Sequence, residues 1–212
     1  MRSLAAMRRA VGGASVPSVS QIARRDRDPF RILISTILSL RTRDDVTEAA
    51  SERLFAIADT PHALARLDLR KIERVIYPAG FYHTKARTIR DVARRLESEY
   101  DSRVPDSMEE LLTFKGVGRK TAALVVSLGY NRPAICVDTH VHRISNRLGW
   151  VRTRTPDQTE QALMATVAKR HWIGINEVMV SFGQTVCMPV SPRCSACPLT
   201  RACPRIGVKK SR

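Results

Sequence analysis

A glycine turn, a lysine and an aspartate follow one another in the segment LTFKGVGRKTAALVVSLGYNRPAICVDTH, residues 112–140. Gly116 and Gly118 stand between two apolar runs, so the backbone there can take left-handed angles and turn its N–H groups toward an anion such as a phosphate. Lys120 opens the next run, and Asp138 precedes a further run at a position typical of a helix N-cap. This order provides a candidate amine nucleophile and a candidate charge-stabilising carboxylate.

Four of the five cysteines lie near the C-terminus with the spacing CxxxxxxCxxCxxxxxC: Cys187, Cys194, Cys197 and Cys203. Four thiolates on short loops can hold a zinc ion or an iron–sulfur cluster, and the spacing alone leaves both open. Disulfides are the less favoured interpretation, because no hydrophobic signal-peptide core precedes them and the chain is long enough to bury an adequate core. Cys136 stands apart from the other cysteines and is expected to be buried.

Composition favours a polyanionic partner. The chain carries 36 lysines and arginines against 20 aspartates and glutamates, a net charge of +16 and a pI near 10.6, so its surface attracts polyanions. A basic pI is also typical of ribosomal and membrane-surface proteins, and only the glycine turn narrows the choice to DNA. No apolar run approaches the ~20 residues of a membrane span.

Nearly every segment places apolar residues at three- and four-residue steps, which predicts an all-α fold without strands. Residues 86–96 carry an apolar stripe opposite a charged face, and residues 31–40 are apolar enough for a core helix. Two further helix starts are predicted from cap signals: Asp106 with Glu109 before the glycine turn, and Thr155 with Pro156 and Gln158.

The motifs resemble the helix-hairpin-helix DNA glycosylases and, within them, the endonuclease III family. In this resemblance Gly116, Val117 and Gly118 correspond to the hairpin that grips a DNA phosphate. Lys120 corresponds to the Schiff-base nucleophile and Asp138 to the catalytic aspartate. The resemblance therefore implies a DNA repair enzyme that acts on the sugar of a damaged nucleotide.

The segment VDTHVHR and the cysteines extend the likeness. VDTHVHR matches the family's pattern, and it adds His140 and Arg143 as expected DNA contacts. A metal at His140 and His142 is not expected, because histidines one residue apart on a helix point to different faces. The cysteine spacing is similar to the family's 4Fe-4S loop, so the resemblance selects an iron–sulfur cluster held by the four cysteines.

Two segments depart from the family's pattern. Leu40 and Arg41 stand where the family has a glutamine that fills the gap left by the flipped nucleotide. Arg41 is expected to fill that gap and bond the orphaned base, to hold a phosphate, or to pair with Asp44. Phe81 replaces a leucine wedge, so it either unstacks a base step or is a core residue. The candidate DNA contacts in these segments are Arg41, Asp44, Phe81 and Lys85.

By resemblance, residues 29–133 form a central helical domain with the hairpin. Residues 1–28 and 134–212 form a second helical domain with the cluster loop, and a DNA-binding cleft would lie between the two. We expect a monomer in the cytoplasm of a bacterium or archaeon, associated with the nucleoid. The Arg-rich residues 1–27 also fit an organellar presequence, and that alternative stays open.

The implied activity is that of a bifunctional glycosylase and abasic-site lyase in base-excision repair. Such an enzyme extrudes the damaged pyrimidine from double-stranded DNA, expels it by attack of Lys120, and nicks the strand by β-elimination. One alternative is a monofunctional mismatch or adenine glycosylase, whose members lack the lysine. Another is a non-enzymatic DNA-binding or ferredoxin-like iron–sulfur protein. The presence of both Lys120 and Asp138 favours the bifunctional enzyme.

Overall fold

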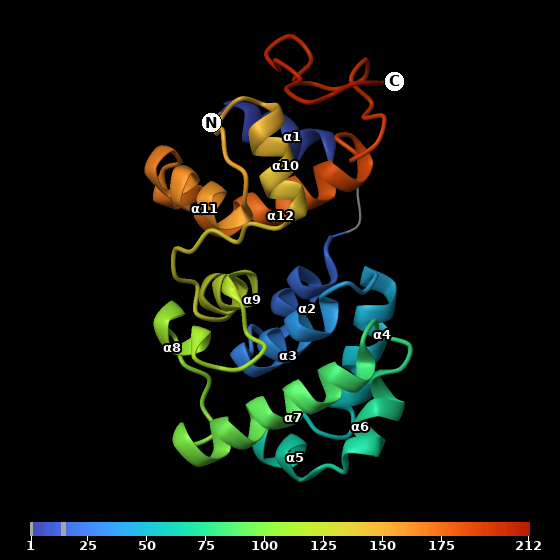
Figure 1. Ribbon diagram of the computed structural model, residues 1–212, viewed down its shortest axis with the longest axis vertical. Helices are drawn as coiled ribbons and strands as arrows, with labels where there is room; N and C mark the ends of the chain where they lie inside the picture. The colour runs from blue at the N-terminus through green and yellow to red at the C-terminus, as the bar shows by residue number, and fades with distance from the viewer. Residues whose placement is uncertain (1, 14–15) are drawn as a thin grey trace. The chain divides into compact units, whose positions relative to one another are not determined.

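The computed structural model describes residues 2–13 and 16–212, so Met1, Ala14 and Ser15 of the predicted N-terminal arm lie outside the described residues. Helices are the only regular elements in these ranges (Figure 1), which confirms the predicted all-α fold. The chain divides into two compact units. We call Ser18–Arg132 the hairpin unit, and Met1–Pro17 with Pro133–Arg212 the cysteine unit.

The hairpin unit is built around α3, whose residues Ile32, Leu33, Ile34, Ile37 and Leu38 are at most 2% exposed. This confirms the predicted core helix, which packs against α2, α4, α7, α9 and η1. The elements of the unit are α2 (Ser18–Asp26), α3 (Pro29–Ser39), α4 (Asp44–Phe55), α5 (Pro61–Arg66), α6 (Leu69–Ile76), α7 (Tyr82–Glu99), α8 (Met108–Leu112), α9 (Arg119–Leu124) and the π-helix η1 (Val125–Gly129).

The 18-residue helix α7 touches two functional segments of the hairpin unit. Its predicted apolar stripe is buried against α5 and α6. Near its C-terminal end, Arg95 donates to Thr113 O at 2.8 Å, and its guanidinium lies 4.3 Å from the centre of the Phe114 ring. Near its N-terminal end, α7 carries Lys85 and follows Phe81. One helix thus supports both the loop before it and the segment that enters the glycine turn.

The hairpin unit begins earlier than the predicted boundary at residue 29. Helix α2 packs on α3 and α4. Arg25 forms ion pairs with Glu48 at 3.0 Å and Glu52 at 2.9 Å, and Ser18 Oγ donates to Asp44 Oδ1 at 2.9 Å. These contacts join α2 to the hairpin unit, so the boundary at residue 29 is wrong.

The cysteine unit has a core of helices followed by an irregular C-terminal segment. Helix α12 packs against α10 and α1. Gly183 of α12 lies so close to α10 that a Cβ there would be 2.3 Å from His140 Nδ1. The elements of the unit are α1 (Arg2–Ala10), α10 (Thr139–Arg147), α11 (Pro156–Thr166), the short 3-10 helix η2 (Lys169–His171) and α12 (Trp172–Thr185). In the described ranges, no helix combines the length and the apolar character needed to cross a membrane.

The two predicted cap signals have different outcomes. Thr155 caps α11 as predicted, since its side chain accepts from Gln158 N at 3.3 Å. The box at Asp106 and Glu109 is wrong by one residue. Ser107 is the N-cap of α8, where it accepts from Glu110 N at 3.2 Å and donates to Glu110 Oε2 at 2.9 Å. The Asp106 carboxylate instead pairs with Arg132 at 2.6 Å.

Candidate functional site

The glycine turn joins α8 to α9, and its two glycines have different roles. Gly116 has a φ of +86°, and a Cβ there would lie 2.5 Å from Thr88 Cγ2 of α7. Gly118, the N-cap of α9, is extended with a φ of −98° and has open space where a Cβ would stand. The predicted left-handed backbone is therefore found at Gly116 alone. Val117 is buried, and its N–H donates to Phe114 O at 3.0 Å.

Lys120 and Asp138 each lie at a helix start, as predicted. Lys120 is the second residue of α9 and is half-buried. Asp138 caps α10, and its Oδ1 accepts from His140 N and Val141 N, each at 2.9 Å. Both cap bonds fall on Oδ1, so Oδ2 takes no part in the cap. Lys120 belongs to the hairpin unit and Asp138 to the cysteine unit.

Arg41 and Phe81 form an exposed pair in the hairpin unit. Both take left-handed backbone angles, with φ of +52° and +58°. The Arg41 guanidinium lies 5.5 Å from the centre of the Phe81 ring, and Phe81 is 63% exposed. The alternative in which Phe81 is a core residue is therefore wrong. Asp44, at the start of α4, accepts a hydrogen bond from Ser18.

Lys85 does not have the exposure that a DNA contact needs. It is 6% exposed, and its Nζ donates to Leu38 O and Leu40 O at 2.6 Å and to Thr42 Oγ1 at 2.7 Å. Burial lowers the pKa of Lys85 to about 8. The predicted role as a direct DNA contact is wrong, because the amine is enclosed by acceptors of the protein itself.

His140 and Arg143 contact each other within the cysteine unit. Arg143 Nη2 donates to His140 Nδ1 at 3.1 Å, to Gly183 O at 3.2 Å and to Cys187 O at 2.9 Å. Burial lowers the pKa of Arg143. Because guanidinium only donates, His140 Nδ1 is the acceptor of the pair. Arg143 therefore ties α10 to the end of α12 and to the first cysteine. This structural role was not predicted, and a DNA contact by either residue stays a prediction.

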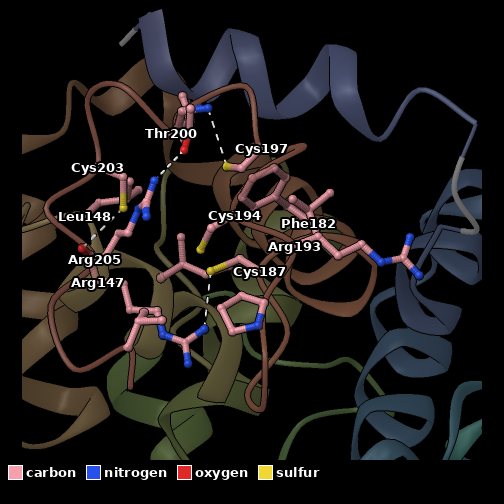
Figure 2. Close-up of a pocket in the computed structure, with 15 residues that line it drawn as sticks. Arg147, Leu148, Phe182, Cys187, Arg193, Cys194, Cys197, Thr200, Cys203 and Arg205 are labelled. Carbon is pink, nitrogen blue, oxygen red and sulfur yellow. Dashed lines mark hydrogen bonds between the residues drawn. The ribbon is translucent and has the colours of Figure 1, made fainter. Parts of the chain in front are cut away.

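The four C-terminal cysteines line one pocket of the cysteine unit (Figure 2). All four are free thiols and partly buried, so the disulfide alternative has no support in the structure. Leu199 N donates to Cys197 Sγ at 3.4 Å, and Arg147 Nη1 donates to Cys187 Sγ at 3.5 Å. Burial raises the pKa of the Cys197 thiol. Within residues 2–13 and 16–212, no three His, Cys, Asp or Glu side chains meet closely enough to hold a single metal ion. The fifth cysteine, Cys136, is buried as predicted.

Arg147 is a residue of this pocket that the sequence analysis missed. Its side chain is buried, and it donates to Met188 O at 2.7 Å and to Pro189 O at 2.8 Å. Its own carbonyl accepts from Ile206 N at 3.2 Å. Arg147 thus attaches the end of α10 to both ends of the segment that carries the four cysteines, residues 187–206, which we call the cysteine segment. A basic residue in the last turn of a helix was the available signal, but its partners lie about 40 residues away.

Comparison with known proteins agrees with this arrangement. The model of a family described as HhH-GPD superfamily base excision DNA repair protein matches residues 34–169. The chain is 50% identical to an endonuclease III of Thermotoga maritima over 179 residues, which cover 84% of each protein. It is 45% identical to the chloroplastic endonuclease III homolog 2 of Arabidopsis thaliana, and the match covers 82% of this chain but 48% of that protein. The chain thus spans about half of the plant relative.

A solved structure gives the same result for the fold. A trapped covalent intermediate of endonuclease III with DNA, described as an estranged-adenine complex, matches with a TM-score of 0.85 and 34% identity. The match covers 96% of this chain and 93% of that chain. The chain therefore belongs to the HhH-GPD superfamily of base excision DNA repair proteins and, within it, to the endonuclease III family.

Proposed function

We propose that this chain removes damaged pyrimidines from double-stranded DNA and then nicks the strand, with Lys120 as the nucleophile. As a member of the endonuclease III family, it is a bifunctional base-excision repair glycosylase and lyase. The observation that carries the assignment of the nucleophile is the position of Lys120. It follows the glycine turn directly, two residues after Gly118, in a chain that is 50% identical to an endonuclease III over 179 residues.

The proposed chemistry uses one amine and one carboxylate. The neutral amine of Lys120 attacks C1′ of the damaged nucleotide, the bond from C1′ to the base breaks, and the base leaves with that electron pair and takes up a proton. The new C1′–nitrogen group loses a proton and the C1′–O4′ bond breaks with protonation of O4′, which opens the sugar and gives a Schiff base with Lys120. Loss of a C2′ proton then drives β-elimination, in which the C3′–O bond breaks and the 3′ phosphate leaves. Asp138 stabilises positive charge that develops on the sugar. A carboxylate with one oxygen outside the cap, as at Asp138, is suited to this role.

The DNA-holding elements support the same activity. The open space beside Gly118 allows a phosphate to approach the backbone closely, and the net charge of +16 favours binding to a polyanion. The exposed pair of Arg41 and Phe81 would occupy the gap that the extruded nucleotide leaves. We further infer a protein that acts as a monomer on nucleoid DNA in the cytoplasm.

The four cysteines fit a 4Fe-4S cluster. The four thiols line one pocket, and membership of the endonuclease III family favours the cluster over a zinc ion, which four thiolates could also hold. Hydrogen bonds to Cys187 and Cys197 suit thiolate ligands, because donors to sulfur stabilise the negative charge of a cluster. When bound, the cluster would cross-link this otherwise irregular segment. We therefore assign it a structural role.

Borohydride trapping tests the function. Wild-type protein incubated with abasic double-stranded DNA and borohydride should form a covalent complex, and Lys120→Gln should form none while retaining DNA binding. Lys71→Gln is the matched control, because it removes the same charge from an exposed position of the hairpin unit. Undiminished trapping by Lys120→Gln would refute the assignment of the nucleophile. A monofunctional glycosylase would release bases without any trapped complex.

Asp138→Asn tests the carboxylate with little change in the fold. Asparagine is as good an N-cap as aspartate, so α10 keeps its start while the charge is lost. Base release from a duplex with a damaged pyrimidine should slow by roughly 10²- to 10³-fold if the charge stabilises the transition state. An unchanged rate would leave Asp138 as a helix cap only.

A further inference from the structure

Lys85 places its amine at the C-terminal end of α3. Two of its acceptors, Leu38 O and Leu40 O, are carbonyls of the last helical turn and the C-cap. Carbonyls at this end of a helix have no partner within the helix, and the helix dipole there favours a cation. The third acceptor is Thr42 Oγ1. An ammonium group has three protons, so each acceptor receives one. The amine thus fixes both the end of α3 and the course of the loop that follows.

The loop before α7 is attached to the same point. Gly80 N donates to Thr42 Oγ1 at 3.1 Å, so this hydroxyl accepts from both Lys85 and Gly80. The backbones are also in direct contact, because a Cβ at Gly80 would lie 2.5 Å from Arg41 O. Residues 39–43 and 77–81 are therefore joined by hydrogen bonds and by a backbone approach that only glycine permits.

Arg41 and Phe81 are the exposed side chains that these two loops present. Each residue has a left-handed backbone, which costs roughly 1–2 kcal/mol for a residue with a Cβ. Such angles persist only where the surrounding structure enforces them. The contacts made by Lys85 and Gly80 lie within one or two residues of both positions. Together with the backbone bonds from Thr42 N to Ser39 O at 3.1 Å and from Lys85 N to Phe81 O at 3.0 Å, they hold the backbone at both positions.

We propose that Lys85 is a positioning residue for gap filling, which joins the two loops so that Arg41 and Phe81 enter the DNA as one preformed pair. The inference rests on the proposed function, since it assumes that the chain extrudes a nucleotide from a duplex. Two separate loops would each lose conformational freedom on binding, whereas a preformed pair has lost it already. Lys85 is enclosed by the protein and acts only through these loops.

The first test compares two DNA substrates. A duplex with a damaged pyrimidine must be opened and its gap filled, whereas a single-stranded abasic oligonucleotide has no stack to enter. For Lys85→Met we expect the rate of base release from the duplex to fall at least about tenfold more than trapping on the single strand. The exposed control Lys71→Met should keep the wild-type ratio of the two rates.

The outcomes separate this inference from the proposed function. Equal losses on both substrates would show that Lys85 only supports folding, and would overturn the positioning role. Absence of trapping by the wild-type protein would overturn the proposed function instead. If Lys85→Met fails to fold, Thr42→Val is the second variant, because it removes the acceptor shared by Lys85 and Gly80 and leaves the charge of the protein unchanged. It should lower the rate on the duplex more than trapping on the single strand. Equal losses for Thr42→Val would overturn the inference as well.

A double-mutant cycle gives the second test. In a protein that already carries Arg41→Ala and Phe81→Ala, Lys85→Met should slow duplex excision by no more than about twofold. Lys85 acts by positioning these two side chains, so its loss matters little once they are absent. A full tenfold loss in that background would mean that Lys85 acts independently of Arg41 and Phe81, and would overturn the proposal.

Discussion

The paired loops of the hairpin unit, residues 39–43 and 77–81, and the cysteine segment of the other unit are both irregular, but they are held in different ways. The paired loops are joined by a buried amine with three acceptors and by a backbone approach at Gly80. The cysteine segment is attached through Arg143 and Arg147, and its four thiols face one pocket. In the paired loops, donors and acceptors of the chain itself hold the structure together. In the cysteine segment, four thiols face one pocket, where they could bind the proposed cluster.

Of the two irregular regions, the cysteine segment should show the largest effect when it is broken, because both the iron and the order of the segment are lost. Cys197→Ser should lose the iron of the purified protein, because a hydroxyl is a poor substitute for a thiolate. Affinity for abasic duplex should fall by at least roughly tenfold, or 1.4 kcal/mol, as the basic C-terminal segment loses its order. Iron analysis and a binding titration measure the two effects. Cys136→Ala is the control, and wild-type iron content in Cys197→Ser would contradict the ligand assignment.

The guanidinium that anchors the cysteine segment should have the next largest effect. Arg147→Met leaves the carbonyls of Met188 and Pro189 without donors. Loss of such buried hydrogen bonds should lower the free energy of unfolding by about 1–3 kcal/mol, and should speed iron release to a chelator. Denaturant titration and chelation kinetics provide the measurements. Arg152→Met, at an exposed position of the same unit, should match the wild type in both.

Gly80→Ala tests the paired loops by separating them. The added Cβ would meet Arg41 O at 2.5 Å, and a backbone atom cannot move aside as a flexible side chain can. Duplex excision should fall by about tenfold, equivalent to 1.4 kcal/mol, while the iron content stays at the wild-type level. Gly13→Ala, where nothing lies within 4 Å, should leave the rate unchanged. Wild-type excision by Gly80→Ala would show that the close approach of the loops is dispensable.

The smallest effect is a pH dependence of stability. Burial lowers the pKa of Lys85 to about 8 in the fold, against about 10.4 in an unfolded chain. Between these values the unfolded chain binds more protons, so the native state gains stability as pH rises. From pH 7 to 9 the wild type should gain roughly 1 kcal/mol over Lys85→Met. Denaturant titrations at both pH values measure the difference, and parallel curves would contradict the shifted pKa.

Features set by neighbouring residues could be predicted from the sequence. The caps at Asp138 and Thr155 depend on backbone groups two and three residues away, and both are confirmed. The cap before α8 is wrong by one residue, because Ser107 and Asp106 are adjacent capping residues and Arg132 attracts the aspartate. A local sequence pattern does not reveal that Asp106 will pair with Arg132, which is 26 residues away.

The roles of Lys85, Arg143 and Arg147 could not be predicted for the same reason. Two of the three acceptors of each residue are backbone carbonyls 40 or more residues away. Every residue has a backbone carbonyl, so the sequence does not mark which ones will accept a hydrogen bond. The resemblance to the endonuclease III family suggested DNA contacts for Lys85 and Arg143, whereas in the fold both side chains hold irregular segments. The positions of Lys120 and Asp138 at helix starts were predicted correctly from the local sequence, and their catalytic roles stay a proposal.

Helix α7 fixes the distance between Phe81 and the glycine turn, because both are attached to this one helix. Phe81 precedes its first turn, and Thr88 contacts Gly116 seven residues later. At 1.5 Å per residue this interval is about 10 Å along the axis, close to the length of three steps of a DNA strand at 3.4 Å each. On the proposed function, in which the glycine turn binds a phosphate and Phe81 enters the base stack, this helix would fix the distance between the two DNA contacts before DNA binds. One inserted residue between Phe81 and Thr88 would turn the two contacts by about 100° relative to each other.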